Sequence, residues 1–337
     1  MRSIPREVGV RFFLPLFLVF LPLLSEARSP DRSLLLVGWD GADRGRLREL
    51  LDADKLPNLA LLVSSGSLVD TLVTTGATET KCGWAEILSG LSADAMGIEN
   101  NRVYRSIPKG ETVFERWREE HGRDVCSVFI GGKINNIGCR GPHEICINCQ
   151  LRDSRTREET YWWDRKRNVG RPLPGLAERW VSREGEPFFH ATAALDTIEL
   201  GLDSADKVGP AAIAAIDACG KRPFFAFVHF EDPDEMGHVY GEASNRYLDG
   251  FVAADIQLGH LLAAIERSGR RSTTTVIVTT DHGMDAASNE HHHAPRTWLA
   301  SDRPGLRSGD RKDVGATLFQ LLGLAAPGRA SRALTQR

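Results

Sequence analysis

Residues 34–41 have the sequence LLLVGWDG, an apolar run that ends in an aspartate followed by glycine. A stretch that is apolar at every position is typical of a strand buried on both faces of a parallel sheet. Open sheets of this kind bind ligands beyond the carboxyl ends of their strands. We therefore predict a buried strand at residues 33–38 that presents Asp40 to such a site.

Two further pairs of aspartate and histidine follow apolar runs later in the chain. They are Asp234 and His238, within EDPDEMGH, and Asp281 and His282, within VIVTTDHGM, with three consecutive histidines at 291–293 soon after. Parallel strands end on one rim of a sheet, so we expect these groups to meet there. Carboxylates with imidazoles suit Zn²⁺, Mn²⁺ or Fe better than Ca²⁺, which prefers oxygen ligands. We predict a metal site; a turn or cap is the alternative for any single pair.

Predicted strands and helices alternate along most of the chain. The strands are expected at 33–38, 69–73, 124–130, 224–230 and 274–279, and the helices at 47–63 (where Pro57 enters a second helix), 84–91, 210–219, 247–268 and 313–324. This alternation favours the α/β class, with a predominantly parallel central sheet covered on both faces. The chain of 337 residues is long enough for one large domain. We predict an α/β/α sandwich that forms a single domain over residues 28–337.

Residues 134–185 interrupt the alternation. They are rich in Arg, Glu, Asn and Gly and include Tyr161, Trp162 and Trp163. We interpret this stretch as a small insertion that caps the rim of the sheet, and a plain surface excursion is the alternative.

The first 27 residues predict a secretory signal peptide. Three arginines precede residues 12–24, which are all apolar or proline, and Ser25-Glu26-Ala27 offers small residues for cleavage. The apolar run is too short to span a bilayer comfortably, although an uncleaved anchor is the alternative. We expect a secreted or periplasmic protein with no stable membrane span after cleavage. The formal net charge is −3 without a basic cluster, so we expect no nucleic-acid binding.

Six cysteines are candidates for disulfides in an exported protein. They are Cys82, Cys126, Cys139, Cys146, Cys149 and Cys219. Cys146 and Cys149 have the spacing of a metal-binding pair, but a zinc knuckle would need a second close pair, which is missing. We expect one or two loop disulfides, whose pairing the sequence does not specify.

Thr80 is the candidate nucleophile, within the stretch ETKCGWAEILSG at residues 79–90. It lies at the start of a predicted helix, where free N–H groups and the helix dipole favour an anion. A threonine hydroxyl becomes a competent nucleophile when a metal lowers its pKa. On these residues alone, a role as the N-cap is the favoured alternative.

These motifs, in this order, resemble those of the alkaline phosphatase superfamily, which includes nucleotide pyrophosphatase/phosphodiesterases, sulfatases, phosphopentomutases and phosphonoacetate hydrolases. Asp40 matches the first aspartate of the family pattern, and Thr80 lies ten residues before Gly90 of an L-[ST]-G motif. The family's PDxxGH and DHG motifs match residues 233–238 and 281–283. The resemblance runs from about residue 34 to residue 324 and implies an alkaline phosphatase-like catalytic domain of the threonine-nucleophile branch.

The resemblance implies two divalent metal ions, Zn²⁺ first, with Mn²⁺ or Fe as alternatives. One would be bound by Asp234, His238 and a late histidine, and the other by Asp40, Thr80, Asp281 and His282. The late histidine comes from His291, His292 or His293, and we favour His292.

The resemblance also implies that Thr80 attacks phosphorus and forms a phosphothreonine. Lys133, in the stretch IGGK, resembles a lysine near the substrate anion, and Lys81 beside the nucleophile is a second cationic candidate. A solvated turn lysine is the alternative for Lys133.

Two departures from the family pattern restrict the activity. Formylglycine sulfatases carry Cys or Ser in a C/S-x-P-x-R setting, whereas Thr80 is followed by KCGW, and Cys82 does not replace it. Phosphodiesterase members usually carry Asn at the position of Gly83. The first departure argues against sulfatase activity of that type, and the second weakens a nucleotide pyrophosphatase interpretation.

We interpret the chain as an exported, metal-dependent hydrolase of small-molecule or head-group phosphate esters, either a phosphomonoesterase or a phosphodiesterase. The alternatives are a phosphonate hydrolase or an envelope phosphotransferase at the same site, or a non-catalytic metal-binding protein. The substrate stays open, because residues 134–185 match no pattern that we can interpret.

Overall fold

The computed structural model describes residues 32–146, 149–150, 163–164, 171–172, 179–328 and 330–335. The predicted signal peptide, Tyr161 and Trp162 lie outside these residues, so the predictions of export and of signal cleavage stay predictions.

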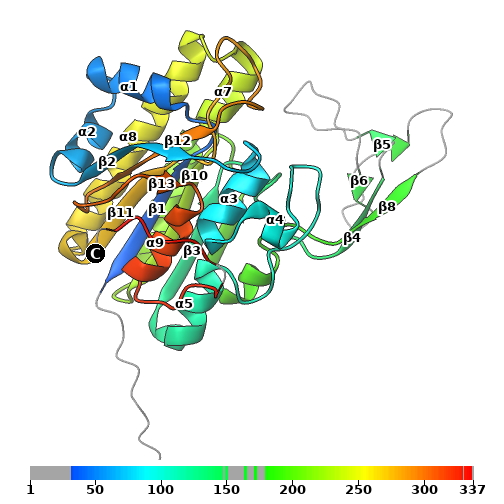
Figure 1. Ribbon diagram of the computed structural model, residues 1–337. Coiled ribbons are helices and arrows are strands. Elements are labelled where there is room, and N and C mark those ends of the chain that lie inside the picture. Colours follow the sequence, from blue (N-terminus) through cyan, green and yellow to red (C-terminus); the bar gives the residue numbers. More distant parts are fainter. Residues whose placement is uncertain are drawn as a thin grey trace, which may run out of the picture.

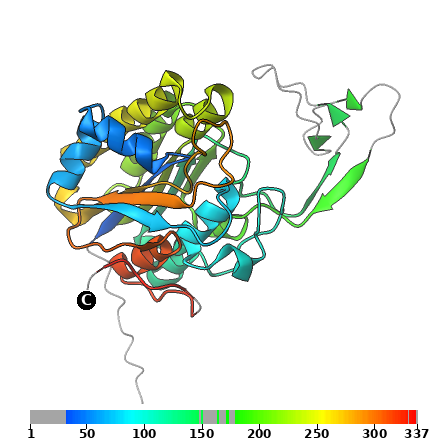
Figure 2. The same ribbon diagram turned by 45° about the horizontal axis from the view of Figure 1, so that its top comes forward.

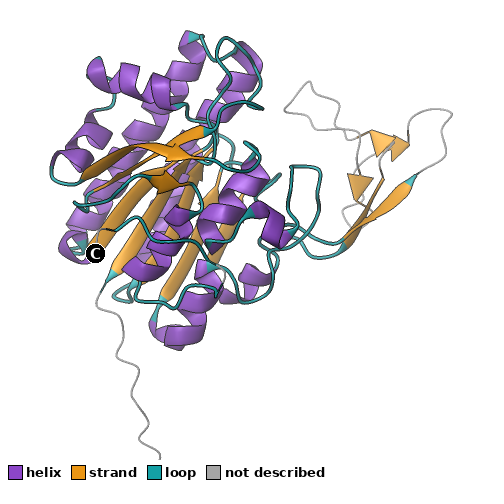
Figure 3. Ribbon diagram, viewed as in Figure 1, coloured by secondary structure: helices purple, strands orange, loops and turns teal. Residues whose placement is uncertain are grey.

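An eight-stranded sheet forms the centre of the fold, in the order β13-β2-β12-β11-β1-β10-β3-β9 (Figures 1 and 3). Its strands are β1 (Ser33–Trp39), β2 (Ser67–Val73), β3 (Cys126–Gly131), β9 (Thr197–Leu200), β10 (Phe224–Phe230), β11 (Thr274–Thr279), β12 (Arg296–Ser301) and β13 (Gly309–Asp310). The five strands from β11 to β9 are parallel, and only β12 runs antiparallel to its neighbours. The predicted strand at 33–38 is therefore the centre of a parallel sheet, flanked by β10 and β11.

Helices cover both faces of this sheet (Figure 3). They are α1 (Arg44–Asp52), α2 (Pro57–Ser64), α3 (Thr80–Ser89), α4 (Ala93–Met96), α5 (Val113–His121), α6 (Ala205–Ala218), α7 (Asp232–Tyr240), α8 (Asn245–Arg267) and α9 (Asp313–Leu321), with short 3₁₀ turns η1 (Gly122–Asp124), η2 (His190–Ala194) and η3 (Arg271–Thr273). The predicted α/β/α sandwich is confirmed.

The side chains of β1 show why its sequence is apolar at every position. Leu35 and Val37 belong to a hydrophobic cluster shared with α1, α2, α6 and α8. Leu34 and Leu36 point to the other face and belong to a cluster shared with α3, α5 and α9. Each fully buried Leu or Val contributes about 1.5–3 kcal/mol, so both faces of the strand stabilise the fold.

Among the described elements, the sequence patterns did not predict α4, α5, α7, β9 and β12. A capping box opens α5, because Thr112 accepts a hydrogen bond from the backbone of Glu115 and the Glu115 carboxylate accepts one from the backbone of Thr112. The T-x-x-E pattern of residues 112–115 is a sequence signal for this helix start.

One helix among the described residues, α8, is long and apolar enough to cross a membrane, and half of its most apolar window is buried inside the fold. Its buried residues, including Phe251 and Leu258, belong to the first hydrophobic cluster. This packing is that of a core helix.

The described strands of the insertion form two small sheets. Strand β4 (His143–Cys146) lies between β6 (Trp163–Asp164) and β8 (Trp180–Arg183), and β5 (Cys149–Gln150) pairs with β7 (Arg171–Pro172). These strands extend away from the sandwich in both views (Figures 1 and 2). The proposed cap role of residues 134–185 stays a prediction.

A disulfide joins Cys126, the first residue of β3, to Cys219 at the end of α6. It therefore links two core elements rather than two loops. Among the cysteines whose side chains are described, Cys82 and Cys139 are free.

Replacing both Cys126 and Cys219 with serine is expected to lower the free energy of unfolding by about 2–4 kcal/mol, because the bond closes a long loop in the unfolded chain. The sequence separation of 93 residues places this loop among the long ones. Urea unfolding with and without reductant measures the effect. Reductant should destabilise the wild type and the Cys139→Ser control equally and leave the double variant unchanged; equal sensitivity of all three proteins would contradict the assignment.

Candidate active site

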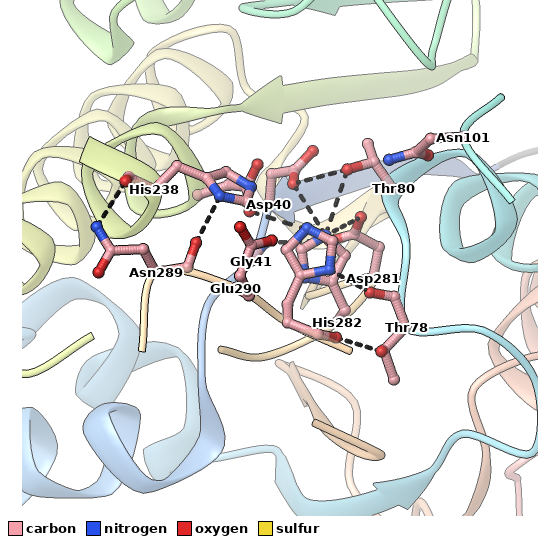
Figure 4. Close-up of polar contacts among 12 residues, drawn as sticks. Asp40, Gly41, Thr78, Thr80, Asn101, His238, Asp281, His282, Asn289 and Glu290 are labelled. Atoms are coloured by element: carbon pink, nitrogen blue, oxygen red, sulfur yellow. Dashed lines mark hydrogen bonds and ion pairs between the residues drawn. The ribbon is translucent and has the colours of Figure 1, made fainter. Parts of the chain in front are cut away.

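Three aspartates meet at the carboxyl ends of three adjacent strands. Asp40 directly follows β1, Asp281 lies just beyond β11, and Asp234 lies in the first turn of α7, which starts just after β10. All three are buried, and the backbone N–H of Gly41 donates to Oδ1 of Asp281 at 3.1 Å (Figure 4). The expected convergence on one rim is what the structure shows.

Two overlapping groups of side chains have the spacing of metal ligands. One consists of Asp40, Asp281 and His282, and the other of Asp234, His282 and His291, with the ligand atoms of each group within 4.8 Å of one another. Nε2 of His282 lies 3.5 Å from Oδ1 of Asp40 and 3.9 Å from Oδ1 of Asp234, so it is common to both groups. His238 lies at the edge, with Nε2 3.5 Å from Oδ1 of Asp234.

Three histidines among the candidate metal ligands share one hydrogen-bonding arrangement. Nδ1 of His238 bonds to the carbonyl of Asn289 at 2.7 Å, Nδ1 of His282 to that of Gly283 at 2.9 Å, and Nδ1 of His291 to that of Thr78 at 2.6 Å. A carbonyl only accepts, so each Nδ1 carries the proton and each Nε2 is left as a lone-pair donor. Histidine ligands of metals are typically oriented by such backbone contacts.

Among the three consecutive histidines, the structure places His291 in the site. It is buried, and its ring centroid lies 4.0 Å from that of His282. Burial and the neighbouring His282 lower the pKa of His291 to about 4, so its ring is neutral at pH 7. His292 and His293 are exposed and face Glu290 and Asp285. Of the three histidines, it is His291 that lies beside the other candidate ligands, whereas His292, the histidine favoured from the sequence, points away from them.

The three aspartates of the site carry more negative charge than the single ammonium of Lys133 can balance. Lys133 lies between two of the aspartates, with Nζ 3.0 Å from Oδ1 of Asp40 and in contact with Oδ2 of Asp234. Burial opposes ionisation of Asp40 and Asp234, but the charge of Lys133 and the neighbouring histidines together outweigh it and lower the pKa of both carboxyls. Burial and then the charge of Asp40 raise the pKa of Asp281 well above its ordinary value.

The donor set fits divalent cations. Oδ1 of Asp234 and Oδ2 of Asp281 are buried and have no hydrogen-bond partner among the described residues. Buried carboxylate oxygens without partners are costly unless a proton or a metal satisfies them. Together with the three bare Nε2 atoms, they form the mixed oxygen and nitrogen set that Zn²⁺, Mn²⁺ and Fe accept.

Thr80 is the first residue of α3, and its hydroxyl points into this site. Oγ1 lies 3.3 Å from Nε2 of His282 and 3.5 Å from Oδ1 of Asp40 (Figure 4). The N-cap position belongs to Glu79, and the Thr80 hydroxyl makes no capping hydrogen bond among the contacts of the described residues. Thr80 is therefore not the N-cap of α3, which was the alternative to its role as the nucleophile.

The two candidate lysines have different surroundings. Lys133 contacts the carboxylates, as described above, whereas Lys81 donates from Nζ to the carbonyls of Asn101 and Val103, both at 2.8 Å. Burial lowers the pKa of Lys81. The structure thus places Lys81 against the loop at residues 101–104 and Lys133 in the site.

Asn101 is a polar neighbour of Thr80 that the sequence analysis missed (Figure 4). Its Oδ1 accepts from the backbone N–H of Lys81 at 2.9 Å, so its NH₂ group remains available as a donor. Gly83 cannot supply such an amide, because a Cβ there would lie 2.5 Å from Cβ of Asp281. The close approach of α3 to Asp281 explains the glycine at this position.

Arg311 is a second residue that the sequence analysis missed. It is fully buried and donates to Glu86 on α3 at 2.9 and 2.7 Å. It also donates to the carbonyl of Asp281 at 2.7 Å and to that of Ala77 at 3.0 Å. Arg311 therefore joins the nucleophile helix, the loop before it and the Asp281 turn.

The type I phosphodiesterase/nucleotide pyrophosphatase family model matches residues 34–332 of the chain. The chain belongs to this family. A venom phosphodiesterase from Naja atra is 34% identical over 68 residues, which are 20% of this chain and 8% of the venom protein. A venom phosphodiesterase 2 from Crotalus adamanteus matches with the same identity and coverage. The aligned segment thus spans less than a tenth of these relatives.

Solved structures show the same fold. An alkaline phosphatase superfamily protein from Vibrio parahaemolyticus has a TM-score of 0.57 at 14% identity, covering 92% of this chain and 70% of that one. Murine ectonucleotide pyrophosphatase/phosphodiesterase 5 has a TM-score of 0.54 at 14% identity, covering 89% and 98%. Alkaline phosphatase from the Antarctic bacterium TAB5 has a TM-score of 0.54 at 13% identity, covering 88% and 99%. At these identities the likeness establishes an alkaline phosphatase-like fold.

Replacing Arg311 with leucine is expected to lower the free energy of unfolding by about 3–5 kcal/mol, because Glu86 is left buried without a countercharge. Replacing Glu86 and Arg311 together with leucine should be less destabilising than the single change. Arg48→Ala, at an exposed ion pair with Asp70, is the control and should change stability by less than about 1 kcal/mol. Urea unfolding at pH 7 measures all three; a double variant less stable than Arg311→Leu would contradict this account.

Proposed function

We propose that this protein is a metal-dependent hydrolase of phosphate esters that uses Thr80 as its nucleophile. The observation that carries the proposal is the position of the Thr80 hydroxyl, within 3.5 Å of both Asp40 and His282 at the edge of the two ligand groups. Membership of the type I phosphodiesterase/nucleotide pyrophosphatase family supports phosphodiesters as the substrate class.

The site residues divide between two divalent cations in this proposal. Asp40, Thr80, Asp281 and His282 would bind one, and Asp234, His238 and His291 would bind the other. Bound cations of this kind lower the pKa of a coordinated hydroxyl and neutralise charge on a phosphoryl group. Zn²⁺ is the metal we propose, because the set mixes imidazole and carboxylate donors.

Thr80 attacks phosphorus through Oγ1. The new bond joins Oγ1 to phosphorus, the ester bond to the leaving alcohol breaks, and the proton of the hydroxyl is lost to solvent. The leaving oxygen takes up a proton from water. Attack of water on the phosphothreonine then breaks the bond to Oγ1, releases the phosphate product and restores Thr80.

Three groups of the chain are placed to bind the phosphoryl oxygens. The positive end of the α3 dipole favours an anion next to Thr80, although the N–H of Lys81 is already bonded to Asn101. Asn101 offers its NH₂ group from the adjacent loop, since its Oδ1 is already held by Lys81. Lys133 offers an ammonium whose pKa is raised, because burial lowers it but the surrounding carboxylates of Asp234, Asp40 and Asp281 together outweigh that effect. These donors orient the ester so that phosphorus faces Oγ1.

Thr80→Ala is expected to lower hydrolysis of an aryl phosphodiester by about three orders of magnitude or more, because no other hydroxyl replaces the nucleophile. The assay uses Zn²⁺-loaded protein with bis(4-nitrophenyl) phosphate, and 4-nitrophenyl phosphate, an aryl phosphonate ester and 4-nitrophenyl sulfate distinguish the other ester classes. Thr80→Ser is the matched control and should retain measurable activity. Acid quenching should trap phosphorylated protein only when residue 80 has a hydroxyl. Undiminished hydrolysis by Thr80→Ala would reject the proposed nucleophile.

His291→Ala is expected to weaken Zn²⁺ binding by at least about 10-fold, since even residues that only orient ligands contribute 10- to 100-fold. His292→Ala is the matched control, because it changes the adjacent, exposed histidine and should leave binding unchanged. Competition with a chromophoric chelator measures both affinities. Loss of binding in His292→Ala with retention in His291→Ala would restore His292 as the ligand.

A further inference from the structure

His229 lies beside Asp40 in a position that the neighbouring strands create. On β10 it is in register with Gly38 of β1 on one side and with Gly131 of β3 on the other. Trp84 of α3 lies over Gly38, where a Cβ would come within 2.4 Å of the indole. The rings of Trp84 and His229 meet edge to face, with centroids 5.3 Å apart. Gly38 thus leaves room for the indole of Trp84, which packs against the ring of His229 on this face of the sheet.

Both of these side chains contact the same oxygen of Asp40. Nε2 of His229 lies 2.7 Å from Oδ2, and Nε1 of Trp84 lies 3.2 Å from it. Oδ1 faces the opposite direction, toward Lys133, Thr80 and His282, at 3.0, 3.5 and 3.5 Å. The two oxygens of this carboxylate therefore have separate surroundings: Oδ2 is inside the protein and Oδ1 is in the site.

The tautomer of His229 follows from these contacts. Asp40 is an ionised carboxylate and accepts only, so Nε2 of His229 must carry the proton that it shares with Oδ2. Nδ1 is then a bare nitrogen, and it is buried without a hydrogen-bond partner among the described residues. A proton on Nδ1 would leave a buried donor unsatisfied, which is costly.

We propose that His229 is a positioning residue that, together with Trp84, holds Oδ2 of Asp40 and commits this aspartate to bind metal through Oδ1 alone. The inference rests on the proposed metal site and extends it to a group that touches neither substrate nor metal. Its consequence is selectivity: single-oxygen carboxylate ligands suit the four-coordinate shell of Zn²⁺, whereas Ca²⁺ takes more oxygens and often binds both of one carboxylate.

The first test observes the hydrogen bond itself in the wild-type protein. Long-range ¹H–¹⁵N NMR of ¹⁵N-histidine protein should show His229 as the Nε2–H tautomer, assigned by its absence in His229→Gln. This measurement requires neither catalytic activity nor correct folding of the His229→Leu variant. A proton on Nδ1 would overturn the proposal.

The second test compares Zn²⁺ affinity and Zn²⁺/Ca²⁺ selectivity in matched variants. His229→Leu removes the donor and is expected to weaken Zn²⁺ binding by about 10- to 100-fold and to reduce selectivity over Ca²⁺. His229→Gln keeps an N–H group at similar reach and should restore most of the affinity. Phe225→Leu changes a buried residue on the same face of β10 without contacting Asp40, so it should lower stability but leave Zn²⁺ affinity unchanged.

The outcomes separate this inference from the proposed function. If the wild type binds Zn²⁺ and His229→Leu binds it equally well, the positioning role is rejected and the proposed function stands. If Phe225→Leu loses as much affinity as His229→Leu, the effect is one of packing and the inference is rejected. If the wild type binds no Zn²⁺, both proposals are rejected.

Discussion

Three carboxylates, from Asp40, Asp234 and Asp281, lie buried at the ends of three adjacent strands, and one ammonium group, from Lys133, offsets part of their charge. Buried charges of one sign repel strongly in a medium of low dielectric constant. The other groups of the site are consistent with this constraint. Histidines present bare nitrogens, two carboxylate oxygens lack partners, and the pKa of Asp281 is raised by burial and by its acidic neighbour. A site built in this way favours cations over any neutral ligand.

Close approach of backbone segments makes this concentration of charge possible. Gly41 has φ of +64°, and a Cβ there would lie 2.6 Å from Oδ1 of Asp234. Gly83 allows the nucleophile helix to lie against Asp281, and Gly38 allows the indole of Trp84 to lie on the sheet. Each glycine removes a side chain at a point where two elements that carry site residues touch. The glycines next to the aspartates therefore belong to the architecture of the site as much as the charged groups do.

The sequence predicted the class of fold and the rim of the site, because both depend on local patterns. Runs that are apolar at every position predict buried parallel strands. The aspartates that follow such strands therefore lie at the same edge of the sheet. The choice among three adjacent histidines depends instead on a loop. Thr78 accepts from Nδ1 of His291 through its carbonyl and donates from its hydroxyl to the carbonyl of the same residue, which selects this histidine by tertiary contact. No pattern in residues 291–293 encodes the position of Thr78.

The surroundings of Lys81 and His229 also depend on tertiary contacts that the sequence pattern does not show. Lys81 follows the nucleophile directly, yet its ammonium lies 4.2 Å from the ring centroid of Tyr104, and Arg183 of strand β8 lies 4.3 Å from the same centroid. Each cation–π contact of this kind contributes about 0.5–2 kcal/mol. Tyr104 thus links Lys81 of α3 to Arg183 at the base of the insertion. His229 belongs to an apolar strand, and the contact of its ring with Asp40 depends on the pairing of β10 with β1.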